Sequence, residues 1–334
     1  VCTPKCTTEK DCSDNNPCTV DACGKDGVCA WTGVKPGLVC GDGKVCGKAN
    51  QCVDLTAGWA RNLTGDAYGY HFCVTTSTGG VACWGRNQYY QAGNGNTTAS
   101  QTKPWLVAGL SGIKDVEAGR HHTCALSSIG EVWCWGRNNY GQTAPGLKAT
   151  VIGTPQKIAG MLAVRELALG DEYSCALHAD RTVSCWGYNT YGQLGHGNTT
   201  TQLQVKKVAG LTGVMVLASD YRHTCALRSD GGLYCTGYNS DRQTNELSGN
   251  RLYFTKRTLA DDLRLTNVMT GMMTTCGAVG DGWGCVGNSS YGAMGNGSTA
   301  DAVDAVSVDA NKQPIAQMAG GYYAHYALTP TGAV

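Results

Sequence analysis

The chain has 334 residues, of which only 15% are charged, and 26 Lys and Arg nearly balance 25 Asp and Glu. A net charge of +1 argues against binding of nucleic acid or anionic membranes through bulk charge. No stretch approaches the roughly 18 apolar residues that span a bilayer, and the chain opens at Val1 without a signal-type apolar block, so we expect a soluble, processed chain without a transmembrane segment.

Cysteine is the most informative residue type, because 19 cysteines occur at regular spacings. Zinc sites of the usual kind are not predicted, since Cys-x-x-Cys pairs are absent and few His lie near the Cys. Structural disulfides are the better interpretation, and they persist in oxidising compartments. We therefore expect an extracellular or outer-surface location, with which a lipidated Cys upstream of Val1 would be compatible.

Residues 1–54 are predicted to form a small module held together by disulfides, because so short and polar a segment cannot bury a core by itself. Its cysteines are odd in number, so one thiol is free, pairs upstream of Val1 or pairs between chains, and the connectivity stays open. The stretch from Cys12 to Cys23 resembles the cysteine-rich repeats of secreted and surface proteins of myxobacteria and their relatives. The nine cysteines are Cys2, Cys6, Cys12, Cys18, Cys23, Cys29, Cys40, Cys46 and Cys52.

The same module carries side-chain oxygens of the type that bind Ca²⁺ in some acidic Cys-rich modules. They belong to Asp11, Asp14, Asn16 and Asp21. The regular spacing of a calcium loop is absent, so a solvated acidic loop is the preferred interpretation and we expect no cofactor.

From Cys73 onward the chain is an internal repeat, because cysteines recur there at intervals of 51, 51, 50 and 51 residues. Each is followed by a second cysteine nine or ten residues later. We predict one disulfide within each repeat. The pairs are Cys73–Cys83, Cys124–Cys134, Cys175–Cys185, Cys225–Cys235 and Cys276–Cys285.

Each repeat has room for four short strands. Around Cys175, a polar turn at residues 178–181 predicts a β-hairpin, in which side-chain alternation lets the sulfurs of Cys175 and Cys185 meet. Apolar runs at 205–211 and 214–218 predict two further strands. Four strands of about five residues with their turns account for a 51-residue unit, which is the size of a propeller blade.

The motifs Gly-x-x-His-Thr-Cys-Ala-Leu, Cys-Trp-Gly-x-Asn-x-x-Gly-Gln-Leu-Gly and Val-x-Gly-Leu resemble the RCC1 repeat, whose family folds as a seven-bladed β-propeller. The fold class that this resemblance implies is all-β, an RCC1-like propeller of five full blades and the start of a sixth, in which Tyr326 replaces the first Cys. A propeller closes to hide its strand edges, so we expect more blades after Val334, or strands supplied from elsewhere. The predicted domains are 1–54 and 55–334, with repeats near 55–110, 111–161, 162–211, 212–263, 264–313 and 314–334.

A tyrosine lies six residues after the second cysteine in four of the repeats and is the candidate binding residue. A recurring Tyr on one loop offers an aromatic surface to a protein or a sugar, and the alternative is that its ring braces the turn. Asp241 takes this position in the fourth repeat, which favours an asymmetric protein or glycan partner. The candidates are Tyr89, Tyr140, Tyr191 and Tyr291.

Three histidines, His71, His122 and His223, lie two residues before the first cysteine of their repeats. A ring of imidazoles could hold a metal, but Tyr173 and Thr274 occupy the equivalent positions, so a repeated packing hydrogen bond is the preferred interpretation and no metal site is predicted.

No linear catalytic motif of a hydrolase, metalloprotease or phosphate-binding loop occurs, although a carboxylate pair in a propeller's axial channel needs none. Asn-x-Ser/Thr sequences are ordinary turns in a bacterium and glycan acceptors in a eukaryotic secretory pathway. They begin at Asn62, Asn96, Asn198, Asn288 and Asn296.

We interpret the chain as a secreted or cell-surface, non-enzymatic binding platform whose loops contact a protein or glycan in an extracellular assembly or in adhesion. The resemblance also implies nucleotide exchange on a small GTPase and chromatin binding, but those roles are cytosolic or nuclear, where such disulfides would not persist. A secreted bacterial inhibitor of β-lactamases belongs to the same superfamily, which makes inhibition of an extracellular enzyme the first alternative. An axial-channel lyase or hydrolase is the second.

Overall fold

The structure is a computed structural model, and every regular element it describes is a strand. None of the described segments forms a helix long and apolar enough to cross a membrane. The described residues are 19–23, 29–33, 39–41, 44–46, 52–54 and 60–328, the last range with gaps at 67, 97, 162, 245–246, 258–264, 280–281, 309–314, 316 and 321–324.

Five four-stranded antiparallel sheets follow one another along the chain, each pairing its strands in sequence order. They are β6 (Ala60–Gly65), β7 (His71–Thr76), β8 (Val81–Arg86) and β9 (Ser100–Leu106); β10 (Ile113–Ala118), β11 (His122–Ser127), β12 (Val132–Arg137) and β13 (Val151–Lys157); β14 (Val164–Leu169), β15 (Tyr173–His178), β16 (Val183–Gly187) and β17 (Gln202–Lys207); β18 (Val214–Asp220), β19 (His223–Arg228), β20 (Leu233–Gly237) and β21 (Arg251–Arg257); and β22 (Asn267–Thr270), β23 (Thr274–Val279), β24 (Gly282–Gly287) and β25 (Ala302–Ser307).

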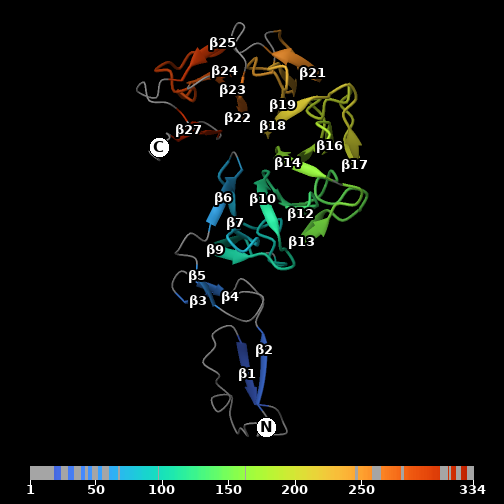
Figure 1. The fold of residues 1–334 in the computed structure, drawn as a ribbon, viewed down its shortest axis with the longest axis vertical. Helices are drawn as coiled ribbons and strands as arrows, with labels where there is room; N and C mark the ends of the chain where they lie inside the picture. The colour runs from blue at the N-terminus through green and yellow to red at the C-terminus, as the bar shows by residue number, and fades with distance from the viewer. Residues whose placement is uncertain are drawn as a thin grey trace.

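A two-stranded sheet of β26 (Gln317–Gly320) and β27 (His325–Leu328) follows the fifth blade. The first strands of successive blades contact one another around a common axis, so that β6, β10, β14, β18 and β22 lie innermost (Figure 1). This is the predicted all-β propeller, with five four-stranded blades and two strands of a sixth.

Five short strands precede the blades and lie outside the ring (Figure 1). They pair as β1 with β2 and as β3, β4 and β5. The structure does not describe the side chains of the nine N-terminal cysteines, whose connectivity stays open, nor those of Asp11, Asp14, Asn16 and Asp21, for which a solvated acidic loop is preferred over a calcium site. The strands are β1 (Thr19–Cys23), β2 (Cys29–Gly33), β3 (Val39–Gly41), β4 (Lys44–Cys46) and β5 (Cys52–Asp54).

Each of the five blades joins its second and third strands through the predicted cysteine pair. In the third blade Cys175 is directly opposite Cys185 in the register, with Cα atoms 4.2 Å apart and both side chains fully buried. The sulfurs of the other four pairs are bonded in the same way. Side chains alternate between the two faces of a strand, so the Trp that follows the second cysteine points to the opposite side of the sheet from the disulfide.

Blades pack by placing the Trp side of one sheet against the cysteine side of the preceding sheet. Trp135 lies in one buried cluster with Cys73 and Cys83, and its indole Nε1 donates to the Gln91 carbonyl at 2.8 Å. Trp186 repeats this bond to the Gln142 carbonyl at 2.9 Å. The core is therefore a series of apolar layers between neighbouring blades.

The histidines contribute a second repeated contact between blades. His71 bonds the Thr123 hydroxyl at 2.9 Å, and His223 bonds Thr275 at 3.1 Å. His122 makes the same contact with the Ser174 hydroxyl at 3.0 Å. Complete burial lowers the pKa of His71 and His122 to about 3 and that of His223 to about 4. These contacts support the packing interpretation of the three histidines.

One predicted strand was misplaced. The outermost strand of the third blade spans Gln202–Lys207 and not the apolar run 205–211. Val208 and Leu211 are buried in the core between blades, and Gly210 has a φ of 74°, so this part of the run forms a turn into the next blade. Val208 and Leu211 are therefore apolar because the connection between two blades is buried, and not because they belong to a strand.

Candidate functional site: a tyrosine–arginine face

One face of the propeller is built from two sets of loops, those between the first and second strands of a blade and those between the third and fourth. The two sets are joined by backbone hydrogen bonds, such as that from Arg137 N to the His121 carbonyl at 2.9 Å. Side chains from both sets therefore gather on the same surface.

The predicted tyrosines lie on the second set of loops, and their rings are not what holds the turn. The backbone N–H of Tyr140 donates to the Gln142 side-chain Oε1 at 2.9 Å. Asp241 makes the same bond to Gln243 at 3.1 Å without an aromatic ring. The bracing alternative therefore explains the backbone and the Gln of this turn, and it leaves the recurrence of Tyr unexplained.

The rings of three predicted tyrosines instead contact the next blade. Ring centroids are separated by 4.8 Å between Tyr89 and His121 and by 5.3 Å between Tyr191 and Tyr238. Tyr140 contacts Tyr188 in the same manner at 4.8 Å. Tyr291, on the corresponding loop of the fifth blade, is 69% exposed.

These contacts belong to a continuous chain of nine aromatic rings that crosses four blades, with neighbouring centroids 4.8 to 6.4 Å apart. The contact between Tyr68 of the first blade and Tyr221 of the fourth joins the two halves of this chain. In order, the rings are those of Tyr140, Tyr188, Tyr191, Tyr238, Tyr221, Tyr68, Tyr70, His121 and Tyr89.

Four Arg guanidinium groups lie over rings of this chain, at distances typical of cation–π contacts. We call the nine rings and these four arginines the tyrosine–arginine face. The pairs are Arg86 over Tyr70 at 4.7 Å, Arg120 over Tyr68 at 4.3 Å, Arg137 over Tyr89 at 5.1 Å and Arg222 over Tyr191 at 4.6 Å.

Two carboxylates lie beneath the arginines. Asp171 is 3.6 Å from Arg120 and 3.9 Å from Arg222, and Glu172 accepts a hydrogen bond from Arg137 at 2.7 Å. Their side chains are only 6% and 11% exposed, whereas the three arginines are 24 to 31% exposed. The arginines are therefore more exposed than the carboxylates that compensate their charge.

Burial raises the pKa of both Asp171 and Glu172 to about 7, although the neighbouring arginines oppose the shift. Burial also lowers the pKa of His121 to about 3, and Arg120, Arg137 and Arg86 lower it further. As the pH falls below 7 the carboxylates become protonated while His121 stays neutral, so the face gains positive charge.

Sequence reasoning missed most of this face. Arg86 and Arg137 directly follow the Cys-Trp-Gly motif of their blades. The equivalent position is Tyr188 in the third blade and Tyr238 in the fourth, where Thr236 replaces the Trp. This alternation of Arg and Tyr at one repeat position is the signal that could have identified the face.

A second group of carboxylates lines the inner strands. Burial raises the pKa of Glu117 on β10 to about 8 and that of Glu166 on β14 to about 7. Glu117 accepts a hydrogen bond from the Thr64 hydroxyl at 3.2 Å. Among the described residues, the cluster of potential metal ligands is Cys276, Cys285 and His325, whose two sulfurs are bonded to each other.

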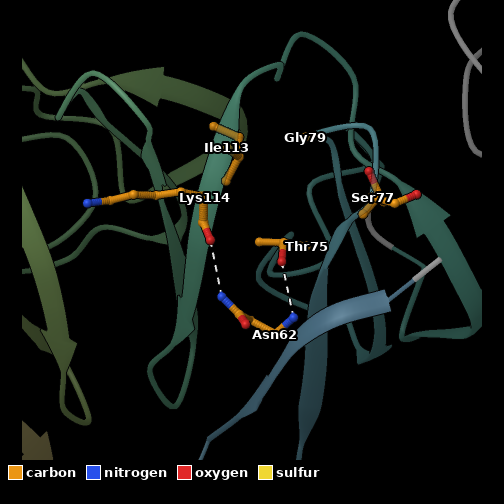
Figure 2. A pocket seen from close by; sticks show the side chains of 7 residues that line it. Asn62, Thr75, Ser77, Gly79, Ile113 and Lys114 are labelled. Carbon is orange, nitrogen blue, oxygen red and sulfur yellow. Dashed lines mark hydrogen bonds between the residues drawn. The ribbon is translucent and has the colours of Figure 1, made fainter. Parts of the chain in front are cut away.

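A polar pocket of about 330 Å³ lies between the first two blades. Asn62 spans it, donating from Nδ2 to the Lys114 carbonyl at 3.1 Å and from its backbone N–H to the Thr75 hydroxyl at 3.2 Å (Figure 2). The Lys114 side chain extends away from Asn62 (Figure 2). Its amine donates to the Arg165 carbonyl at 3.0 Å. The lining offers hydroxyl and amide groups and no carboxylate, which does not favour acid–base chemistry.

Comparison with known proteins agrees with this architecture. Two models of the regulator of chromosome condensation (RCC1) repeat match, one at residues 78–126, 130–177 and 182–227 and the other at 113–142, 164–193 and 219–243. The chain carries RCC1 repeats in an RCC1-like β-propeller.

Solved structures of other proteins show the same fold. Human WBSCR16 superposes with a TM-score of 0.72 at 20% identity, covering 84% of this chain and 75% of that one. Yeast RCC1 (Prp20), solved bound to Kap60, gives 0.68 at 19% identity, covering 81% of this chain and 68% of that one. At these identities the likeness concerns the fold alone.

Curated relatives share only the repeat region. The probable E3 ubiquitin-protein ligase HERC4 of Homo sapiens is 32% identical over 148 residues, which are 41% of this chain and 13% of the relative. Human protein RCC2 is 31% identical over 141 residues, or 41% of this chain and 27% of the relative. The chain thus matches between about an eighth and a quarter of the length of these proteins.

Proposed function

We propose that this protein is a non-enzymatic binding platform that holds a protein partner on its tyrosine–arginine face, in an extracellular or cell-surface assembly. The observation that carries the proposal is the continuous chain of nine rings and four arginines across four blades. Tyr and Arg are the residue types enriched among side chains that dominate binding energy in protein interfaces.

The contacts between blades favour binding because they hold the face in place before a partner arrives. The Tyr191 hydroxyl accepts a hydrogen bond from Arg222 at 2.6 Å, and its ring packs on Tyr238. Side chains that are already ordered lose less conformational entropy on association, so more of the contact energy contributes to affinity.

The compartment is inferred from the cysteines. Five disulfides at the centres of five blades are compatible with an oxidising environment and would be unusual in the cytosol or nucleus.

Proteins of the same fold bind other proteins. Yeast RCC1 (Prp20) was solved bound to Kap60, and the structure of Prp20p was presented together with its binding properties to Gsp1p and histones. We carry over from them only the use of the propeller for protein contact.

The test compares two variants of the immobilised protein for capture of partners from the extracellular fraction of its source. One variant, Tyr68→Ala with Tyr191→Ala and Arg222→Ala, alters the face. The control, Ile129→Ala with Arg181→Ala, alters exposed turns on the opposite side of the blades. We expect a protein retained by the wild type and the control and lost from the face variant. Retention by the face variant, loss from the control, or capture of glycan alone would refute the proposal.

A further inference from the structure

The junction between the second and third blades shows how the face holds a carboxylate. Glu172 accepts from Arg137 Nη1 at 2.7 Å and makes a short hydrogen bond with the Gln142 side-chain Nε2. The orientation of this Gln amide is fixed, because its Oε1 accepts the backbone N–H of Tyr140 at 2.9 Å. One guanidinium and one amide N–H therefore converge on one carboxylate.

The same pair of donors recurs one blade earlier as Arg86 and Gln91. Gln91 Oε1 accepts the backbone N–H of Tyr89 at 2.9 Å, as Gln142 does that of Tyr140. Arg86 N donates to the carbonyl of Tyr70 at 2.7 Å, which matches the bond of the equivalent arginine in the second blade. The two donors thus start from the same backbone positions and the same amide orientation as the pair that holds Glu172.

The acceptor differs at this earlier junction. His121 lies three residues before the first cysteine of its blade, which is the position that Glu172 has in the next blade. Gln91 is fully buried, and within the described part of the chain its Nε2 has no hydrogen-bond acceptor. No described carboxylate lies within ion-pair distance of Arg86. His121 Nε2 lies 4.0 Å from Glu172 Oε1, while His121 Nδ1 has no described hydrogen-bond partner.

We propose that Arg86, Gln91 and His121 form a carboxylate-binding socket on the tyrosine–arginine face, into which the partner inserts an Asp or Glu side chain. This inference rests on the proposed function and specifies its partner as a protein with an acidic contact segment. The rings of Tyr70 and Tyr89, with centroids 6.2 and 4.8 Å from that of His121, flank the socket.

The local charge favours this ligand over a cation. Arg86, Arg120 and Arg137 all lie close enough to His121 to lower its pKa, and burial keeps the imidazole uncharged. Asp171 and Glu172 already pair with Arg120 and Arg137, which leaves Arg86 as the guanidinium of the three without a described ion pair. A planar guanidinium with an adjacent amide matches a carboxylate, as the contacts of Glu172 show in the same molecule.

The test uses a C-terminally amidated hexaglutamate peptide as the probe, with binding measured by isothermal titration calorimetry on the whole chain. Two variants address the socket. Arg86→Met removes the guanidinium. His121→Glu places a carboxylate of the protein itself at the repeat position that Glu172 has in the third blade. The matched control Lys206→Met removes one positive charge from the exposed outer strand β17.

We expect the wild type and Lys206→Met to bind the peptide equally, and both socket variants to bind it at least tenfold more weakly. His121→Glu should also melt at a higher temperature than His121→Gln, because its carboxylate would occupy the socket. Equal weakening in Arg86→Met and Lys206→Met would mean charge attraction without a site, and undiminished binding in both socket variants would equally overturn the inference. Preference for inorganic phosphate over the peptide would overturn the assignment of a carboxylate.

Failure of the socket and failure of the proposed function are distinguishable. If a protein partner is lost from the face variant but captured unchanged by Arg86→Met and His121→Glu, the face stands and the socket is wrong. If the peptide binds only through the socket but no protein needs the face, the socket stands and the proposed function is wrong.

Discussion

Replacing Cys175 and Cys185 together with Ala should remove a large part of the stability of the third blade. The disulfide closes a loop with a sequence separation of 10, and in the chain-entropy model such a crosslink contributes about 3 kcal/mol to the free energy of unfolding. Both sulfurs are fully buried in the layer that also holds Val183 and Leu194, so their loss leaves a cavity that costs about 1 kcal/mol per sulfur.

The expected loss is therefore about 4 to 5 kcal/mol, measured as the free energy of unfolding in urea by circular dichroism. The matched variant Cys225→Ala with Cys235→Ala has the same sequence separation and should lose a similar amount. Non-reducing peptide mapping of the wild type accompanies the measurement. A loss below 1 kcal/mol in both variants, or peptides that link different blades, would refute the reasoning.

Other predictions concern pH, packing and metals. Burial raises the native pKa of Glu117 to about 8 and those of Glu166, Asp171 and Glu172 to about 7. Between about pH 4.5 and 8 the native state therefore binds more protons through these groups than the unfolded state, so their contribution to stability is lost as the pH rises through this window. We expect the melting temperature to fall between pH 6.5 and 8, and Glu117→Gln to flatten that fall. The buried histidines act oppositely, because their lowered native pKa costs stability as the pH falls below 6.5. His122→Ala should reduce this acid sensitivity and lower the free energy of unfolding at pH 7 by about 2 kcal/mol, since removal of the buried imidazole leaves a cavity and the Ser174 hydroxyl keeps only its bond to the Gln142 carbonyl. An unchanged pH profile would contradict that role. EDTA should leave the melting temperature of the propeller unchanged, and a large drop restored by Ca²⁺ or Zn²⁺ would reveal a metal site.

The repeat period and the hairpin register follow from sequence because they depend on local pairing. Cys175 and Cys185 have a fixed separation and alternate with apolar residues, so their contact across one hairpin is specified within a dozen residues. The outermost strand was harder to place, because the long loop before it is organised by the buried Asn189, whose Oδ1 accepts the Leu194 N–H at 3.0 Å and whose Nδ2 donates to the Asn198 carbonyl at 2.9 Å.

The tyrosine–arginine face was only partly foreseeable, because its contacts join different blades. The predicted tyrosines were found from their period, but the bond between Arg137 and Glu172 joins residues 35 positions apart that share no motif. Its existence depends on how one sheet stacks on the next. Tyr68 and Tyr221 meet only because the first and fourth blades approach each other. Neither contact can be recognised from the separation of its two residues along a single sequence.

Hydrogen–deuterium exchange of the whole chain, with and without its captured partner, tests the central claim most directly. We expect protection on partner binding in loops 68–70, 119–121, 188–191 and 221–222, and unchanged exchange in the opposite turns 128–131, 179–182 and 229–232. Protection confined to those opposite turns, with no change at the tyrosine–arginine face, would contradict the account.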